Sequence, residues 1–160
     1  MKVFVGGPIQ HAVDQNGKIV TPIKEILVYL IDMLIVNGFE IVSAHIEEQF
    51  GEISDKFTDE EICIRDYSWM CECDKYIAIF PTDDANELIQ SAGTNVELGW
   101  ATAKRKDVVI ICDKREDFST VVKGLTSVGK VNYLELKQVL EQPECLLKIL
   151  IASDEETENV

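Results

Sequence analysis

The sequence has little positive charge: 15 lysine and arginine residues stand against 29 aspartate and glutamate residues, which gives a net charge of −14. A surface of this sign repels a phosphate polymer, so we expect no DNA or RNA partner. It does not exclude one small phosphorylated ligand, because local backbone N–H groups can bind a single phosphate. Long apolar runs are also absent, and none approaches the roughly 18 residues that a membrane span needs.

Several patterns that signal cofactors or crosslinks are missing. Neither GxGxxG nor GxxxxGKS/T occurs, so dinucleotide-binding and P-loop folds lack their motifs. The five cysteines are an odd number, and the glycine-broken start MKVFVGGP does not resemble a signal peptide. We therefore expect a cytoplasmic protein with reduced thiols. Cys71 and Cys73 lack the second pair or histidine cluster that would complete a zinc site, so we predict neither a metal nor an organic cofactor.

Short apolar runs alternate with helical patterns along the chain, which has 160 residues and 46% hydrophobic content. This alternation predicts a doubly wound α/β fold: a five-stranded parallel sheet in flavodoxin-like (Rossmann-like) order with helices on both faces. One domain is expected over 1–152, followed by an acidic, disordered tail over 153–160. The predicted strands are 2–6, 39–43, 75–80, 107–112 and 131–134, and the predicted helices are 22–37, 58–73, 94–104 and 136–151.

Ligands of such sheets bind beyond the carboxyl ends of the strands. In this sequence that edge should carry the loop that starts at Gly6, the Ser43–His45 turn, the 81–93 loop and the segment after Cys112. The segment after the second strand, up to about residue 56, is expected to be irregular or partly helical. His45 ends that strand at the ligand edge, although a lone histidine is more often structural than functional.

Glu97 is the first candidate for chemistry. It follows a predicted strand and a polar loop, in the first turn of a helix that begins with the pattern Thr94-Asn-Val-Glu97. A structural role fits this position as well, because glutamate at the third residue of a capping box is common. The helix N-terminus also favours an ionised carboxylate, which is the form a nucleophile requires. Ser91-Ala-Gly93 precedes the same helix and leaves N–H groups for an anion about one turn from Glu97.

Asp66 is the second candidate because it interrupts an apolar helix face. Ile62, Trp69 and Met70 lie at positions −4, +3 and +4 from it, so all three share its face. A buried carboxyl group tends to have a raised pKa, which suits proton donation. The alternative is a structural aspartate that is bonded to a backbone group or to Arg65 of a neighbour.

A resemblance to a known family rests on the runs VFVGGPI, SAHIEE, RDYSWM, CDKYIAIFP and SAGTNVELGWATAKRKDVVII. Together they resemble the nucleoside 2-deoxyribosyltransferase superfamily, over about residues 2–135. The Ser-x-Gly-x-x-x-Glu-Leu-Gly pattern within them is most similar to the branch that hydrolyses nucleoside 5′-monophosphates, in particular the CMP and hydroxymethyl-CMP N-glycosidases. The resemblance implies an enzyme that acts on a small nucleotide without a cofactor, and a homo-oligomer.

The resemblance also implies a role for each candidate residue. Glu97 matches the nucleophile that forms a covalent glycosyl ester, and Asp66 matches the acid that assists departure of the base. The other positions match groups that bind the sugar or its 5′-phosphate: Gly6, Gly7, Pro8 and Ile9 in the first loop, His45, the phosphate-binding Ser91 and Gly93, and Ser119 (or Thr120 or Ser127), which would reach the phosphate across a dimer interface.

Two positions depart from the family pattern. Some relatives carry an arginine just after the first glycine loop, where this chain has Ile9-Gln10-His11. Others have a tyrosine in strand one, where this chain has Val3 or Phe4. The resemblance implies hydrolysis of a CMP-like nucleoside 5′-monophosphate by two carboxyl groups, as in retaining glycosidases. The alternatives are a deoxyribosyltransferase, which uses a second base as acceptor, and a nucleotide-binding sensor without catalysis.

Overall fold

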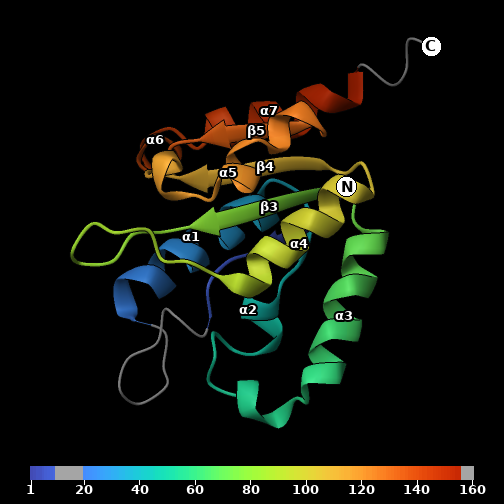
Figure 1. Cartoon of the computed structure of the whole chain (residues 1–160), viewed down its shortest axis with the longest axis vertical. Coiled ribbons are helices and arrows are strands. Elements are labelled where there is room, and N and C mark those ends of the chain that lie inside the picture. The colour runs from blue at the N-terminus through green and yellow to red at the C-terminus, as the bar shows by residue number, and fades with distance from the viewer. Residues whose placement is uncertain (10–19, 156–160) are drawn as a thin grey trace.

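The computed structural model of the chain describes residues 1–9 and 20–155. Its five strands form one sheet in the order β2-β1-β3-β4-β5, and every neighbouring pair is parallel (Figure 1). This is the doubly wound, flavodoxin-like order that the sequence predicts. The strands are β1 (Lys2–Gly6), β2 (Glu40–Val42), β3 (Lys75–Phe80), β4 (Asp107–Cys112) and β5 (Val131–Leu134).

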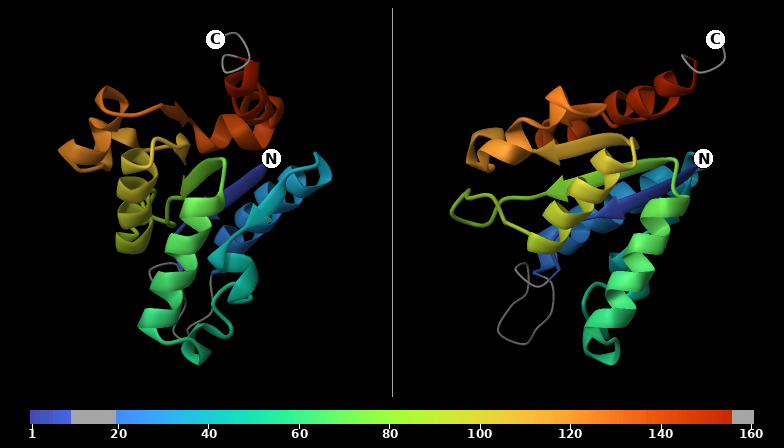
Figure 2. Two further views of the ribbon diagram at one scale, coloured as in Figure 1. Left: turned by 90° about the vertical axis from the view of Figure 1, so that its right-hand side faces the viewer. Right: turned by 45° about the vertical axis from the view of Figure 1, so that its right-hand side comes forward.

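Helices cover both faces of the sheet (Figure 2). Three pack on one face: α1 (Thr21–Val36), α6 (Leu136–Glu141) and α7 (Glu144–Glu155). Three pack on the opposite face: α3 (Asp59–Glu72), α4 (Ala92–Ala103) and α5 (Thr120–Lys123). Successive side chains of a strand point to opposite faces. Strand β3 is therefore buried along its whole length, with Ile77 and Ile79 in the first core and Tyr76 and Ala78 in the second.

The segment after β2 is partly helical, as expected. It contains α2 (Ala44–Glu47) and a short 3-10 turn, η2 (Ser54–Lys56). Ser43 ends the strand because its side chain accepts a hydrogen bond from the amide of His45 and so caps α2. This turn brings His45 to the carboxyl edge of the sheet, next to the end of β1.

Helix α4 begins two residues earlier than predicted. Its N-cap is Ser91, whose Oγ accepts a hydrogen bond from the amide of Thr94 at 3.2 Å. Thr94 is therefore the third residue of the helix rather than its cap, and the predicted capping box of Thr94 and Glu97 is wrong. Glu97 is the sixth residue of α4. The capping box predicted from Thr58 is present at the start of α3.

The single helix predicted over 136–151 is in fact two helices. Helix α6 ends at Glu141, α7 begins at Glu144, and Pro143 lies between them. Proline has no N–H and disfavours helical geometry in the residue before it. Helix α7 continues through Glu155, and residues 156–160 of the expected acidic tail lie outside the described residues.

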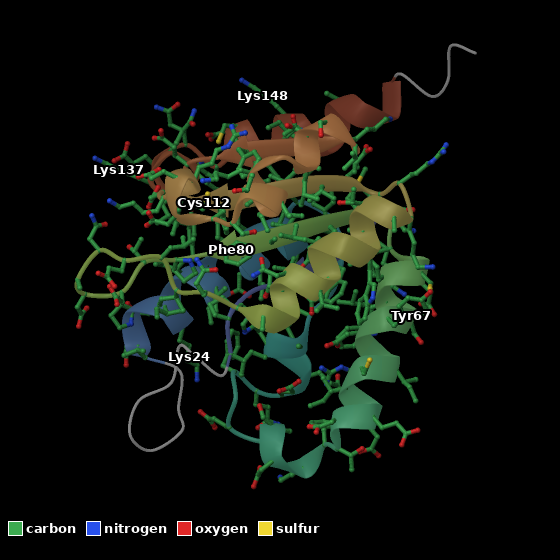
Figure 3. All side chains as sticks on the ribbon, in the orientation of Figure 1. Lys24, Tyr67, Phe80, Cys112, Lys137 and Lys148 are labelled. Atoms are coloured by element: carbon green, nitrogen blue, oxygen red, sulfur yellow. The ribbon has the colours of Figure 1, made fainter. Side chains whose placement is uncertain are left out.

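The carboxyl ends of β3 and β4 lie side by side, since Phe80 and Cys112 are register partners (Figure 3). The chain that follows Cys112 is more helical than predicted, because it holds η3 (Arg115–Asp117), α5 and η4 (Leu125–Ser127) before β5. No helix in the described part of the chain has the length and apolar character of a membrane span.

Candidate active site

A cavity of about 430 Å3 opens at the carboxyl ends of β1 and β2, beside the N-terminus of α4. Its wall comes from the loop after β1, from α2, from the turn at η2, from α3 and from the first two turns of α4. The strand order reverses between β1 and β3, and this is the usual ligand position in a doubly wound sheet. Eight predicted site residues line the cavity: Gly6, Gly7, Ile9, His45, Asp66, Ser91, Gly93 and Glu97.

Glu97 lines the cavity from the second turn of α4, and only 9% of its surface is exposed. The hydroxyl of Tyr76, in β3, donates a hydrogen bond of 2.5 Å to Glu97 Oε2. The pKa of Glu97 is raised to about 7, chiefly by burial; the Tyr76 hydrogen bond opposes this rise, and the nearby Asp66 carboxyl contributes to it. Near neutral pH this group is therefore a mixture of carboxylic acid and carboxylate.

These contacts correct two expectations for Glu97. Its side chain bonds Tyr76 and caps nothing, because Ser91 is the cap of the helix. Glu97 is also not fully ionised near neutral pH, since burial moves its pKa upward. A buried carboxyl group without a capping role is costly to keep, which argues for a part in chemistry.

Gly6 provides the space for the pair of Tyr76 and Glu97. A Cβ atom on Gly6 would collide with both Tyr76 Oη and Glu97 Oε2. Gly6 does not have a positive φ, so the position requires the absence of a side chain rather than backbone freedom. Gly7 is close to His45 in a similar way, because a Cβ on Gly7 would lie 3.0 Å from His45 Nε2.

Asp66 faces the same cavity from α3, with 7% of its surface exposed. Its Oδ1 accepts a hydrogen bond from Arg65 Nε at 2.8 Å. The same guanidinium donates through Nη2 to Glu48 Oε1 at 2.7 Å, and Glu48 Oε2 accepts from the Ser54 hydroxyl at 2.5 Å. Burial raises the pKa of Asp66, although the bond to Arg65 opposes the shift. The partner of Asp66 is thus the preceding residue of the same chain, Arg65, rather than Arg65 of a neighbour. Asp66 keeps the raised pKa that suits a proton donor.

Two aromatic rings hold the Arg65 side chain. Its guanidinium carbon lies 4.8 Å from the centroid of the Trp69 ring and 5.5 Å from that of Phe57. Contacts of this kind favour a fixed guanidinium orientation. The Nη1 atom is buried and has no hydrogen-bond partner within residues 1–9 and 20–155. Arg65 therefore orients Asp66 and keeps one donor group unused.

His45 is fully buried in the cavity wall. Neither ring nitrogen has a hydrogen-bond partner in the described part of the chain. The ring stacks on Phe50, with 6.0 Å between the ring centroids. Burial lowers the pKa of His45 to about 4, so at pH 7 the neutral ring has one N–H donor and one acceptor. An unpartnered polar group at a cavity wall points to a bound ligand.

The N-terminus of α4 forms another part of the wall. Ser91 Oγ lies 2.7 Å from Thr94 Oγ1 and also accepts from the Thr94 amide. The first backbone pair of the helix joins Asn95 N to Ser91 O at 3.0 Å. The amides of Ala92 and Gly93 therefore have no partner inside the helix. Such amides, with the positive end of the helix dipole, suit an anion.

Two predicted site residues do not line the cavity. Pro8 is buried. Ser119 is exposed and caps α5, where its Oγ accepts from the amide of Val122 at 3.3 Å. The role expected for Ser119 across a dimer interface stays a prediction. Gln10 and His11, which replace the arginine of some relatives, lie outside the described residues.

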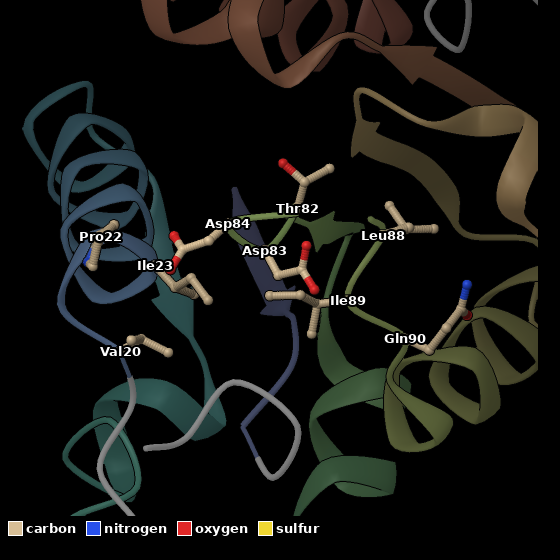
Figure 4. A pocket seen from close by; sticks show the side chains of 9 residues that line it. All are labelled: Val20, Pro22, Ile23, Thr82, Asp83, Asp84, Leu88, Ile89 and Gln90. Atoms are coloured by element: carbon tan, nitrogen blue, oxygen red, sulfur yellow. The ribbon is translucent and has the colours of Figure 1, made fainter. Parts of the chain in front are cut away.

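Another cavity of about 430 Å3 lies between α1 and the 81–90 loop (Figure 4). Its carboxylates belong to Asp83 and Asp84, which are both exposed. Asp83 Oδ1 already accepts hydrogen bonds from the amides of Ala85 and Glu87, both at 2.9 Å, and so shapes the loop. The perturbed carboxyl groups belong to the cavity of Glu97, which we therefore take as the candidate active site.

The sequence profile of nucleoside 2-deoxyribosyltransferases matches residues 4–156. The chain belongs to the nucleoside 2-deoxyribosyltransferase family. It is therefore an enzyme of the nucleoside 2-deoxyribosyltransferase family, as the resemblance implies. A search of curated protein sequences found no significant match to this chain.

Solved structures share the fold of this deoxyribosyltransferase-family chain. The CMP N-glycosidase BcmB of Clostridium botulinum aligns with a TM-score of 0.63 at 22% identity, over 91% of this chain and 99% of that one. BlsM aligns with a TM-score of 0.69 at 26% identity, over 88% and 85% of the two chains. A conserved protein from Enterococcus faecalis V583 gives 0.50 at 20% identity, over 86% and 83%.

Two residues that contact the candidate site, Tyr76 and Glu48, were not predicted from the sequence. A signal exists for Tyr76: it is the one hydroxyl-bearing residue of the otherwise apolar segment YIAIF, and a buried phenol needs a hydrogen-bond partner. For Glu48 we find no such signal, because its burial and its bond to Arg65 depend on how α2 packs against α3.

Proposed function

We propose that this enzyme hydrolyses the N-glycosidic bond of a nucleoside 5′-monophosphate with a pyrimidine, CMP-like base. The observation that supports this best is the pairing, on one helix, of a buried carboxyl group with an anion-binding end. Glu97 follows Gly93 by four residues on α4, which is about 6 Å along the axis. A ribose spans a similar distance from its 5′-phosphate to C1′. A phosphate on the amides of Ala92 and Gly93 would therefore bring C1′ to Glu97.

The first chemical step forms a glycosyl ester. A carboxylate oxygen of Glu97 attacks C1′ while the bond from C1′ to the base nitrogen breaks, and the bonding electrons leave with the base. Asp66, or a water molecule that Asp66 orients, gives the departing base its proton. Arg65, 2.8 Å from Asp66 Oδ1, then stabilises the carboxylate that remains.

The second step is hydrolysis of the ester. Water attacks C1′ and gives a proton to Asp66, while the bond to Glu97 breaks and its electrons return to the carboxylate. The products are the free base and (deoxy)ribose 5-phosphate, and both carboxyl groups regain their starting protonation. Two inversions at C1′ give net retention, as in glycosidases with a carboxylate nucleophile.

The proposed enzyme is a homo-oligomer. Ser119 does not line the cavity of its own chain and lies on the surface at the start of α5, next to Val121, which is 77% exposed. Such a position is compatible with a serine that reaches the phosphate in a second copy. Sedimentation velocity tests the assembly, and Ser119→Ala should weaken binding of a monophosphate without affecting that of a nucleoside.

One assay tests the function. The enzyme is incubated with CMP, with dCMP, and with cytidine plus free adenine, and the bases are separated by chromatography. Free cytosine from CMP or dCMP, absent in Glu97→Gln, is the expected result. Adenine found in a new nucleoside would favour the transferase. Tight CMP binding with neither product would favour the nucleotide sensor.

A further inference from the structure

Tyr76 is the second residue of β3 and has no exposed surface, and its hydroxyl donates to Glu97 Oε2 at 2.5 Å. Among the described residues, 1–9 and 20–155, Tyr76 is the group that donates a hydrogen bond to the Glu97 carboxyl. The structure assigns Tyr76 as a positioning residue for the nucleophile, an inference that rests on the function proposed above. Its phenol holds Oε2 and leaves Oε1 to attack the anomeric carbon.

The phenol is fixed by the sheet itself. Tyr76 and Phe4 are register partners on β3 and β1, and their rings meet edge to face with 5.2 Å between centroids. The hydroxyl reaches Glu97 because Gly6, two residues beyond Phe4 on β1, has no side chain. Two strands and one helix therefore build the pair before any substrate binds, which is how a preorganised site is supported.

Burial and the charged groups around the pair set the pKa values of Glu97 and Tyr76. From α3, the carboxyl of Asp66 raises the pKa of Glu97 and the guanidinium of Arg65 lowers it, while burial has the largest effect and raises it. Burial and Glu97, with smaller contributions from Asp66 and Cys73, raise the pKa of Tyr76 far above its usual value. Tyr76 therefore stays protonated and acts as a donor. A donor stabilises the carboxylate relative to the acid, so Tyr76 enlarges the ionised, nucleophilic fraction of Glu97.

Tyr76→Phe tests this, because it removes the hydroxyl and keeps the ring. The acid limb of the kcat/KM profile should move to higher pH. At pH 6 we expect a loss of about tenfold or more, the usual effect of one hydrogen bond to a charged group. Above the limb, kcat/KM should approach the wild-type value. The matched control is Tyr133→Phe, which loses a hydrogen bond of 2.8 Å to Val122 O outside the cavity and should leave the profile unchanged.

A second measurement needs no substrate. In protein labelled with carbon-13 at the glutamate carboxyl, an NMR titration follows the pKa of Glu97, and Glu97→Gln identifies its signal. The pKa should be higher in Tyr76→Phe than in the wild type. Gly6→Ala, whose Cβ displaces the pair, should shift it in the same direction and serves if Tyr76→Phe does not fold.

Two results would overturn the assignment: an unchanged pKa of Glu97, or an equal loss of kcat/KM at every pH. The first would mean that the phenol does not stabilise the carboxylate, and the second that Tyr76 has only a packing role. If no nucleotide turns over, the proposed function fails, while the titration still decides the role of Tyr76.

Discussion

Glu97 has a pKa of about 7 in the folded protein, against an ordinary value of 4.5. Between these two values the folded protein binds more protons than the unfolded chain. Stability therefore decreases as the pH rises through this window. Above pH 7 the ionised, buried carboxylate costs about 3 kcal/mol relative to a group that does not titrate. The residue that carries the proposed chemistry thus lowers the stability of the fold.

Glu97→Gln should consequently abolish turnover and stabilise the protein. Glutamine keeps the shape and can still accept from Tyr76, but it carries no charge. At pH 8 we expect the Tm to rise by several degrees, and at pH 4, where wild-type Glu97 is protonated, the two proteins should melt alike. Thermal melts at both pH values and the base-release assay measure this. A lower Tm at pH 8 would indicate a structural glutamate, and normal activity would end its assignment as the nucleophile.

Asp66→Asn should lower kcat by about 100-fold or more with little change in KM, because the departing base loses its proton source. Asparagine can still accept from Arg65 Nε, so the local geometry is kept. The loss should be smaller with a nitrophenyl riboside 5-phosphate, whose leaving group needs no proton. Steady-state kinetics with both substrates decides the point, since equal losses would indicate that Asp66 orients the sugar.

The site residues that could be predicted from the sequence are those that stand out among their neighbours along the chain. Asp66 interrupts a helical stripe, and Glu97 belongs to a recognisable run before a helix. Tyr76 and Glu48 depend on contacts across the fold, 21 residues to Glu97 and 17 residues to Arg65. The protonation state of Glu97 was also beyond the sequence, because its burial depends on how β1, β3 and α4 meet.

Among the elements, α4 begins at Ser91, which caps the helix and which we propose also binds the phosphate. Ser91→Ala should lower the stability by about 1 kcal/mol through loss of the cap. It should also reduce kcat/KM for a monophosphate by about 10- to 100-fold, because one charge-assisted hydrogen bond to phosphate is lost. The corresponding nucleoside should be affected much less. Kinetics with CMP and cytidine in parallel measure the difference.

Thr58→Ala is the control for this experiment. It removes the N-cap of α3, which accepts from the Glu61 amide at 3.2 Å, and Thr58 does not line the cavity. It should cost similar stability without changing the preference for a monophosphate. If Ser91→Ala affects nucleoside and monophosphate equally, Ser91 is a cap alone, and the phosphate lies elsewhere.

The elements themselves follow largely from local chemistry. All five strands were predicted from short apolar runs, and their parallel order from the alternation with helices. The errors lie where a choice between neighbouring residues decides a boundary. Serine and threonine both cap helices well, so Ser91 and Thr94 were both possible N-caps of α4. Ser91 is the N-cap because its side chain accepts a hydrogen bond from the Thr94 amide. Leu136–Ile151 reads as one apolar pattern, and Pro143 divides it.

The whole molecule carries a net charge of −14, which repels an anionic substrate before it reaches the cavity. We expect kcat/KM for a monophosphate to rise severalfold when sodium chloride increases from about 10 to about 100 mM, because the Debye length falls from about 30 to about 10 Å. The corresponding nucleoside, which is uncharged, should be insensitive. Initial rates at low substrate concentration measure both. A decrease for the monophosphate alone would instead reveal an attractive local field at the cavity.

Lys106 joins the two helices that carry the candidate carboxyl groups. It lies just beyond the end of α4, and its Nζ donates to the carbonyl oxygens of Cys71 and Cys73, at 3.0 and 2.5 Å, at the end of α3. From this common point the helices diverge toward the cavity (Figure 2). The hydrogen bonds of Lys106 thus join the two helices at their C-terminal ends. Lys106 does not line the cavity, yet we expect its substitution to alter the separation of Asp66 and Glu97, because it removes the hydrogen bonds between the two helices.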